Sequence, residues 1–301
     1  MMKVQLSQGL SWPEDACSSR FRFSELLTFQ VNSWRLLSLL LLCSINSSIA
    51  QSSDTLLHAT ATIHIETARL LTSDKLQQCY VVNEDNELFK YDKNGQLLFQ
   101  YNNNQLGDLE WLDVTDPFNI LLFYPDYFTV ILLNRTLNIT GEYQLFDLNI
   151  TDVNAVAMAN DNELWFFDDN TGKVRKVSRA GDVTGESVNV KLLLGINIQA
   201  LNMLATRNRV FLNAPEFGIL VFDNFGTYLK DIPLKGLASF QILENQLIYQ
   251  EGGKIKSFHL QSFLTSEVEL PFKLEETDQL QIQKGVLLLL KGEELLIYNM
   301  E

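Results

Sequence analysis

From residue 59 onward, the chain alternates short runs of apolar, β-branched or aromatic residues with short polar turns. Three runs, Gln78–Asn83, Glu87–Asp92 and Gln96–Tyr101, show the pattern most clearly. Runs of this kind predict β-strands. The turn between the last two contains Asn-Gly, which readily adopts the positive φ angles of a tight hairpin. The pattern predicts an all-β chain of hairpins, and only Leu192–Met203 is ambiguous between helix and strand.

These runs fall into six units with the same order of strands and turns. Each of the first five contains four candidate strands, which we designate A to D in chain order. The units cover residues 68–101, 109–145, 154–190, 200–234, 237–270 and 278–300. Their equivalent third-strand positions are Tyr91, Leu133, Val177, Phe222, Phe258 and Tyr298. A four-stranded meander that repeats about every 40 residues is typical of the blades of a β-propeller.

The sixth unit is incomplete, because its A, B and C strands are followed by the end of the sequence at Glu301. A ring that stayed open there would expose the edge of a sheet. The segment Thr60–Glu66 alternates with period two and places Ala61, Ile63 and Ile65 on one face. We therefore expect this N-terminal strand to be the D strand of the sixth blade. The sequence predicts a six-bladed β-propeller of four-stranded antiparallel blades, closed by an N-terminal strand.

A pair of β-sandwiches is the alternative fold, since it also contains many short strands. It would not explain six equivalent units with one strand displaced to the opposite end of the chain. We therefore assign residues 51–301 to a single propeller domain, which we expect to be a monomer.

Residues 1–50 predict a signal peptide. Arg35 precedes the apolar run Leu36–Leu42, and a Ser-x-Ala cleavage site ends at Ala50. The apolar run is too short to span a bilayer, so no transmembrane anchor is expected after cleavage. The protein is therefore expected to be exported, to the periplasm, the cell surface or the medium.

The residues before this leader do not suit a signal peptide. We hypothesise that residues upstream of Val31 are an extension and that translation begins at Val31; a long natural n-region is the alternative. Lipidation of Cys43 is not favoured, because Leu42 stands where lipoprotein signals place a small residue.

Charge and cysteine content narrow the function classes. The net charge of −14 and the lack of a basic stripe argue against nucleic-acid binding. Cleavage after Ala50 would leave Cys79 as the lone cysteine, in a predicted strand, so we expect a buried and inert thiol. The three histidines are scattered, and no metal or cofactor motif is present.

The segments 165–185 and 218–230 resemble the repeats of NHL-type and related six-bladed propellers. In both, a hydrophobic strand ends in Asp, a turn containing Gly follows, and a new strand begins. The segments 113–133 and 217–234 resemble exported propeller proteins of Bacteroidetes-type bacteria, and that resemblance covers roughly residues 55–301. It implies a propeller fold and an exported location, and it implies no activity. Signatures of WD, YWTD, kelch and Asp-box propellers are missing from the sequence.

Two turns share the order proline, acid, aromatic: Pro125-Asp126-Tyr127 and Pro215-Glu216-Phe217. They are two repeats apart, and both fall between strands B and C. By analogy with other propellers, B–C loops gather with D–A loops on one rim, where binding residues commonly lie. We predict a binding surface there formed by Tyr124, Asp126, Tyr127, Glu216 and Phe217. The alternative is that both are type I turns whose aromatic packs on the next strand.

Two other groups of residues have both a functional and a structural interpretation. Trp111, Asp113, Asp116 and Phe118 form a dense patch that core packing and a turn explain without a functional role. The acidic runs 83–87 and 160–163 contain calcium-type ligands, yet hairpin turns favour the same residues and no calcium-loop motif is present.

Two functions are consistent with these observations. We favour a non-enzymatic binding scaffold whose partner is a protein or a small ligand. The alternative is a metal-dependent hydrolase or lactonase with its site in the central channel, as six-bladed lactonases hold a metal with Glu, Asn and Asp from different blades. No nucleophile elbow, Walker loop or dinucleotide motif supports catalysis.

Overall fold

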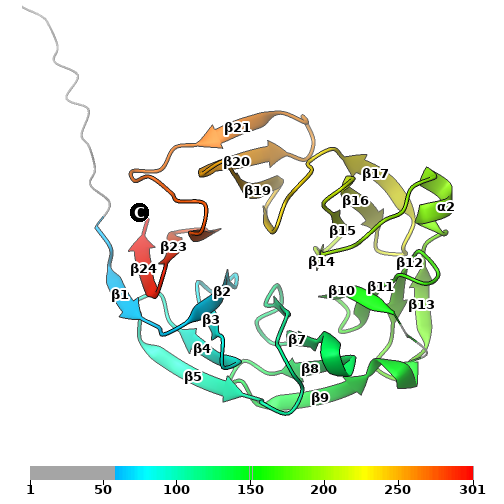
Figure 1. The fold of residues 1–301 in the computed structure, drawn as a ribbon, viewed down its shortest axis with the longest axis horizontal. Coiled ribbons are helices and arrows are strands. Elements are labelled where there is room, and N and C mark those ends of the chain that lie inside the picture. The colour runs from blue at the N-terminus through cyan, green and yellow to red at the C-terminus, as the bar shows by residue number, and fades with distance from the viewer. Residues whose placement is uncertain (1–57, 149, 151, 301) are drawn as a thin grey trace, which may run out of the picture. The chain divides into compact units, whose positions relative to one another are not determined.

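The computed structural model describes residues 58–148, 150 and 152–300. The chain divides into two units, Met1–Asp54 and Thr55–Glu301, and all the described residues belong to the second. Six four-stranded antiparallel sheets form a ring in this unit, and β2, β10 and β14, the first strands of their sheets, lie nearest its centre (Figure 1). This confirms the predicted six-bladed β-propeller. The predicted leader, the Val31 start and Cys43 lie outside the described residues and remain predictions.

The strands follow the predicted units. Blade 1 comprises β2 Ala68–Ser73, β3 Cys79–Asn83, β4 Glu87–Tyr91 and β5 Leu97–Asn102. Blade 2 comprises β6 Trp111–Asp113, β7 Ile120–Tyr124, β8 Thr129–Leu133 and β9 Ile139–Gln144. Blade 3 comprises β10 Val153–Met158, β11 Leu164–Asp168, β12 Lys173–Val177 and β13 Val183–Glu186. Blade 4 comprises β14 Asn202–Ala205, β15 Arg209–Ala214, β16 Gly218–Asp223 and β17 Tyr228–Ile232. Blade 5 comprises β18 Phe240–Leu243, β19 Gln246–Glu251, β20 Lys254–His259 and β21 Thr265–Val268.

Blade 6 confirms the predicted closure of the ring. It comprises β22 Gln279–Gln283, β23 Val286–Lys291, β24 Glu294–Asn299 and the N-terminal strand β1 Ala61–His64. Strand β1 pairs antiparallel with β24, with Ala61 opposite Ile297 and His64 opposite Glu294. The amide of Ile65 extends this pairing by donating to the carbonyl of Glu293 at 2.8 Å. All six predicted third-strand positions lie in third strands.

Each joint between neighbouring blades contains a hydrophobic cluster, so the middle strands are buried on both faces. In β3, Tyr80 and Val82 pack toward blade 2, whereas Cys79 and Val81 pack toward blade 6. This arrangement explains why the middle strands read as continuous apolar runs rather than alternating ones. Cys79 is a free, fully buried thiol, as expected, and burial raises its pKa above the ordinary value.

The turns between strands C and D in blades 1 and 4 share one hydrogen-bonding pattern. In blade 1, Asp92 Oδ1 accepts from the amides of Asn94 and Gln96 at 2.9 and 2.8 Å. In blade 4, Asp223 Oδ1 accepts from the amides of Phe225 and Thr227 at 2.9 and 2.8 Å. The Asp at the end of β16 and the Asp directly after β4 are therefore turn residues, which explains the repeat seen in the sequence.

Helices are short and lie in the connections: η1 Pro125–Tyr127, η2 Leu145–Leu148 and α2 Val190–Leu194. The ambiguous stretch 192–203 thus contains the end of α2, a loop and the start of β14. Asn189 caps α2 by accepting from the Leu192 amide at 2.8 Å, and Gly195 ends it with φ 66°. Among the described residues, no helix combines the length and apolar character needed to cross a bilayer.

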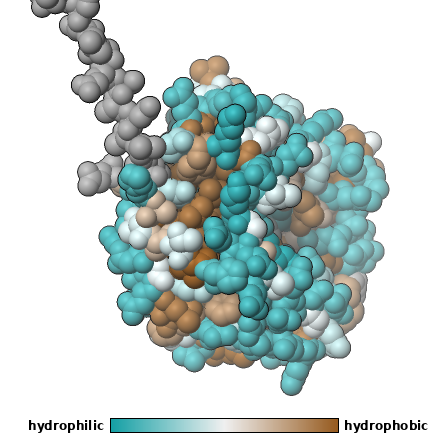
Figure 2. All heavy atoms as spheres, turned by 60° about the vertical axis from the view of Figure 1, so that its left-hand side comes forward, coloured by the Kyte–Doolittle hydropathy of each residue, from teal (hydrophilic) through white to brown (hydrophobic). Residues whose placement is uncertain are grey.

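The outer surface near blade 6 is mainly hydrophilic and is interrupted by apolar side chains (Figure 2). On β5, Leu97 and Phe99 are among the exposed apolar residues. Single exposed apolar side chains are common on soluble proteins, so we look for function in the turns and joints of the ring.

Candidate functional site

The turns of the propeller lie on two rims. Because the strands of each blade are antiparallel, the A–B and C–D turns share one rim, which we call the A–B rim. The B–C turns and the connections from one blade to the next share the other, the B–C rim. The two proline-acid-aromatic turns lie on the B–C rim as predicted, between β7 and β8 and between β15 and β16. They belong to blades 2 and 4, so blade 3 separates them.

The structure places the five predicted contact residues in different environments. Asp126 and Glu216 are exposed, and the Tyr127 side chain is 56% exposed. Phe217 is half-buried and packs against the core cluster between blades 3 and 4, as the turn interpretation expected. Tyr124 is fully buried in the cluster between blades 1 and 2, which corrects its assignment to a contact surface. It is the last residue of β7, a strand whose two faces are both covered.

Sequence reasoning missed Leu192 and its neighbours, which are exposed apolar residues of the B–C rim. Helix α2 presents Leu192, which is 80% exposed, together with Leu193 and the preceding Val188. The helix is held to the B–C turn of blade 3, because Lys191 forms an ion pair with Asp169 at 2.8 Å. An Asn cap, an apolar run and a Gly stop were the signal that could have located α2.

The dense patch at the start of blade 2 has a structural role. Asp113 is buried, and its Oδ2 accepts a hydrogen bond at 2.8 Å from the amide of Met158 in blade 3. Its Oδ1 accepts from the amide and hydroxyl of Thr115. Burial raises the pKa of Asp113 above its ordinary value, although these hydrogen bonds oppose the shift. The Asp113 carboxylate therefore joins blades 2 and 3. Asp116 stabilises its own turn, because its Oδ1 accepts from the Phe118 amide at 3.2 Å.

A cavity of about 340 Å³ opens on the A–B rim between blades 3 and 4, and we call it the blade 3–4 pocket. Its walls come from three turns and two strands that are far apart in the sequence. The A–B turn of blade 3 supplies Asn160 and Asp161, and the strands of that blade supply Trp165 and Lys176. Blade 4 supplies Arg207 and Asn208 from its A–B turn, and Asn224 from its C–D turn.

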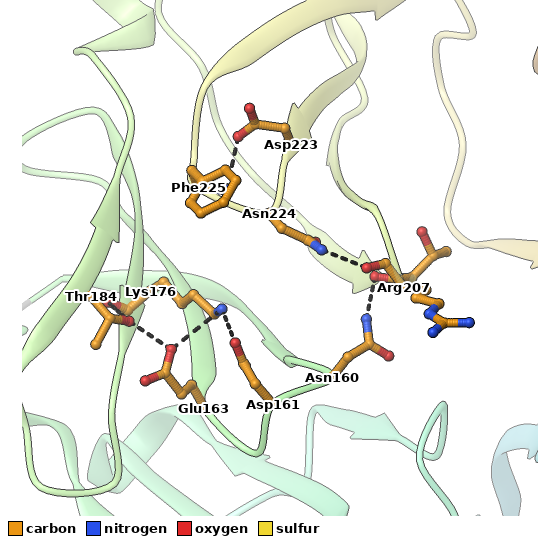
Figure 3. Close-up of polar contacts among 10 residues, drawn as sticks. Asn160, Asp161, Glu163, Lys176, Thr184, Arg207, Asp223, Asn224 and Phe225 are labelled. Carbon is orange, nitrogen blue, oxygen red and sulfur yellow. Dashed lines mark hydrogen bonds and ion pairs between the residues drawn. The ribbon is translucent and has the colours of Figure 1, made fainter.

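Lys176 is the central polar residue on the blade 3 side of the pocket (Figure 3). Its ammonium group forms ion pairs with Asp161 and, at 3.3 Å, with Glu163. It also lies 5.6 Å from the centre of the Trp165 ring, within range of a cation–π interaction. The hydroxyl of Thr184 donates to Glu163 at 2.6 Å, so the second carboxylate is held in place as well.

Two asparagines fix the opposite wall. The side-chain amide of Asn160 donates to the Thr206 carbonyl, and that of Asn224 donates to the Arg207 carbonyl (Figure 3). In each of these bonds the side-chain nitrogen is the donor, so the side-chain oxygen of each asparagine stays available as an acceptor. Phe225, which is 75% exposed, follows Asn224 in the same turn. The Lys176–Asp161 pair and the Asn224–Arg207 pair both line the cavity, and they lie apart in Figure 3.

The composition of the pocket suits a polar ligand. The cations Lys176 and Arg207 are matched by the carboxylates Asp161 and Glu163, so the site has no large net charge. Asparagine amides supply both donors and acceptors. The volume falls at the small end of the range for pockets that bind small molecules. Among residues 58–148, 150 and 152–300, no group of three or more His, Cys, Asp or Glu is arranged to hold a metal ion.

A smaller cavity of about 250 Å³ lies on the B–C rim between blades 4, 5 and 6. It is lined mainly by turn residues, including Gly236, Gly252 and Gly253, with Lys235 and Glu276 at its sides. It has fewer fixed polar side chains than the blade 3–4 pocket, which we therefore take as the candidate site.

Neither a family model nor a curated protein matches the chain. Solved structures do match. A streptogramin B lyase structure is 12% identical, with a TM-score of 0.54, and covers 79% of this chain and 95% of its own. Virginiamycin B lyase from Staphylococcus aureus is 11% identical, with a TM-score of 0.53 and coverages of 80% and 99%. The WD40 domain of Neurospora crassa Pan2 is 11% identical, with a TM-score of 0.50 and coverages of 74% and 72%.

The likeness is one of fold. At these identities, the lyases and the WD40 domain support a β-propeller and carry no information about activity. The resemblance to NHL repeats and to exported propellers of Bacteroidetes-type bacteria stays a prediction.

Proposed function

We propose that this protein is an exported, non-enzymatic binding propeller that takes a small polar ligand in the blade 3–4 pocket. The observation that carries the proposal is the pocket itself, in which Lys176, Asn160 and Asn224 are already held by bonds within the protein. Side chains that are ordered before the ligand arrives lose little conformational entropy on binding. The rigid strands beneath them add to this preorganisation.

The proposal can be tested by nuclear magnetic resonance on the full chain. Trp165 lines the pocket, and its indole N–H signal can be assigned with Trp165→Phe. A library of polar fragments should contain compounds that shift this signal saturably and leave the indole signal of Trp111, in blade 2, unchanged. Bound fragments that all shift Trp111 and none that shift Trp165 would contradict the pocket as the site.

Export is proposed from the leader pattern at residues 36–50. The mature protein recovered from cells should begin at Gln51, as N-terminal sequencing would show. Precursor peptides from Phe21–Gln30 would contradict a start at Val31, and a mature N-terminus within residues 1–50 would contradict cleavage after Ala50.

A second surface is proposed on the B–C rim of blades 2 to 4. Tyr127 and Leu192 are exposed there beside the acidic residues Asp126 and Glu216, with Phe217 supporting the blade 4 turn. Exposed apolar side chains within an acidic surface suit a protein partner with apolar and basic residues.

The partner surface is tested by affinity capture with the purified protein. The double variant Tyr127→Ala/Leu192→Ser should recover much less of a reproducible partner than the native chain. Phe118→Ser, which changes an exposed aromatic on the A–B rim, is the control. Equal recovery by all three proteins would remove this surface.

A further inference from the structure

The same lysine arrangement occurs in two blades. Lys90 and Lys176 occupy the fourth position of the third strand in blades 1 and 3. Each is paired across the sheet with an aromatic residue of the second strand, Tyr80 and Trp165 respectively. The distances from the lysine nitrogen to the ring centre are 5.0 and 5.6 Å. The two blades therefore build equivalent cationic positions at their joints with the next blade.

In blade 1 the joint is closed. The C–D turn of blade 2 covers Lys90, and the lysine nitrogen donates to the Arg135 carbonyl at 2.7 Å. Lys90 is fully buried as a result. An ammonium group buried in this way needs an acceptor oxygen, and the neighbouring blade provides it from its backbone.

In blade 3 the equivalent joint is open. The C–D turn of blade 4 corresponds to that of blade 2, because Asp223 and Asn134 make the same pair of hydrogen bonds to the turn amides. Asn224 thus stands where blade 2 has Arg135. Within the described chain, Lys176 bonds to Asp161 and Glu163, and no backbone carbonyl of blade 4 accepts from it. The cavity of about 340 Å³ lies at the position where, in blade 1, the Arg135 carbonyl meets Lys90.

We propose that the blade 3–4 pocket binds a neutral saccharide, one of whose hydroxyl oxygens accepts a hydrogen bond from Lys176. That oxygen accepts from Lys176 as the Arg135 carbonyl oxygen accepts from Lys90. The proposal rests on the binding function proposed above and specifies its ligand class.

The chemistry of the walls selects this class. An anionic ligand would lie against Asp161 and Glu163, and a cationic one against Lys176 and Arg207, whereas a neutral ligand meets balanced charge. A purely apolar ligand would leave the asparagine amides without partners. Hydroxyl groups both donate and accept, so they match the asparagine oxygens as well as the lysine.

An exposed aromatic residue follows the pocket residue Asn224 in the C–D turn of blade 4, and we expect it to add an apolar contact. Phe225 is exposed beside Asn224, and a sugar ring has a face of C–H groups that packs on an aromatic ring. Asn208, which also lines the pocket, is exposed, and hydroxyl groups can engage both ends of its amide. Phe225 and Asn208 are therefore the residues whose removal should weaken binding without disturbing the core.

The ligand class is tested by titration of the full chain, observed through the Trp165 indole signal. Maltose, cellobiose and N,N′-diacetylchitobiose are the neutral probes; digalacturonic acid and spermidine are the charged ones. Saturable shifts with at least one neutral disaccharide, and none with the charged probes, are expected. If polar fragments shift the signal and none of the neutral disaccharides does, the saccharide proposal is wrong and the binding proposal stands. If nothing shifts it, both are wrong.

Variants test the part assigned to Lys176. Lys176→Met should weaken saccharide binding about tenfold, the effect of losing one hydrogen bond to a charged group. Lys90→Met, at the closed joint, is the matched control and should leave binding unchanged. Phe225→Ala should also weaken binding, whereas Phe118→Ala, an exposed phenylalanine on the same rim in blade 2, should not.

Thermal unfolding of each variant establishes that it is folded. Equal saccharide affinities for Lys176→Met and Lys90→Met would overturn the role of Lys176. Equal affinities for Phe225→Ala and Phe118→Ala would overturn the apolar contact and hence the placement of the sugar at the mouth.

Discussion

The side chain of Gln279 completes the backbone hydrogen bonding of Leu71 across the joint between blades 6 and 1. Gln279 Oε1 accepts from the Leu71 amide at 3.0 Å, and its Nε2 donates to the Arg69 carbonyl at 2.6 Å. Gln281 and Gln283 continue this ladder by donating to the next carbonyls of β2. The ring is therefore closed twice at blade 6, by β1 on β24 at the outer edge and by glutamines at the inner strands.

Gln279→Leu should destabilise the protein by about 1–3 kcal/mol, because it leaves a backbone donor and a backbone acceptor without partners. Gln283→Leu should cost less, since Gln283 makes a single longer bond of 3.4 Å to the Ser73 carbonyl. Urea denaturation of both variants measures the free energies of unfolding. Equal losses would contradict the special role of Gln279.

Gly95 is predicted to be essential for docking the closing strand. It has φ +83°, and a Cβ placed on it would lie 2.7 Å from the Ala61 Cβ of β1. Gly95→Ala should therefore destabilise through both backbone strain and a clash. Gly292→Ala is the matched control, because Gly292 also has positive φ, 58°, but nothing within 4 Å of its Cβ.

The difference between the two variants isolates the contact with β1. Hydrogen exchange should show faster exchange of the β1 amides in Gly95→Ala than in Gly292→Ala. The same stability and the same β1 exchange in both would show that strain at positive φ alone accounts for the effect.

The buried Lys90 should make stability depend on pH. Burial lowers its pKa from 10.5 to about 8, an effect that the charge of Asp74 opposes. Between these two values the unfolded chain binds the proton and the folded chain releases it, so stability from this residue increases as pH rises. Native protein should thus gain stability from pH 7 to 9.5 relative to Lys90→Met, measured by denaturant unfolding. A constant difference between the two would contradict the shift.

Cys79 should be inert in the folded protein. It is fully buried, and burial raises its pKa, so the reactive thiolate is scarce in the native state. In a Cys17→Ser/Cys43→Ser chain, reaction with a disulfide reagent should occur only as fast as the protein opens. The Gln279→Leu variant should react faster, and rapid reaction of the stable parent would contradict this assignment.

Much of the ring was predictable because its signals are local and repeated. The C–D turns of blades 1, 2 and 4 can be recognised in the sequence by an Asp or Asn whose side chain accepts hydrogen bonds from the amides of its own turn, as Asp92, Asn134 and Asp223 do. The strand at Ala61–His64 was identified because the sixth repeat, at residues 278–300, contains only three strands, and a four-stranded blade needs one more. The two proline-acid-aromatic turns were correctly placed between strands B and C, because the repeat gives the position of each strand within its blade.

Burial at strand ends was less predictable. Tyr124 stands beside an exposed turn, yet its strand lies in the middle of a blade, where both faces are covered by neighbouring blades. In such a strand both faces are apolar, so the sequence does not alternate between apolar and polar residues and does not show which side chains are exposed. The sequence likewise did not show whether the Phe217 side chain is exposed or buried. In the structure it packs against the core cluster between blades 3 and 4 and is half-buried.

By itself, the sequence determined the repeat, the strand order and the closure, since each depends on residues close in the chain or on counting units. The blade 3–4 pocket was decided by tertiary structure alone. Asn160, Lys176 and Asn224 belong to separate hairpins, and no spacing in the chain shows that they share a cavity. Whether a joint is closed, as at Lys90, or open, as at Lys176, depends on how the turn of the next blade packs against it. That packing joins segments from different blades, and it is where we place the function of this propeller.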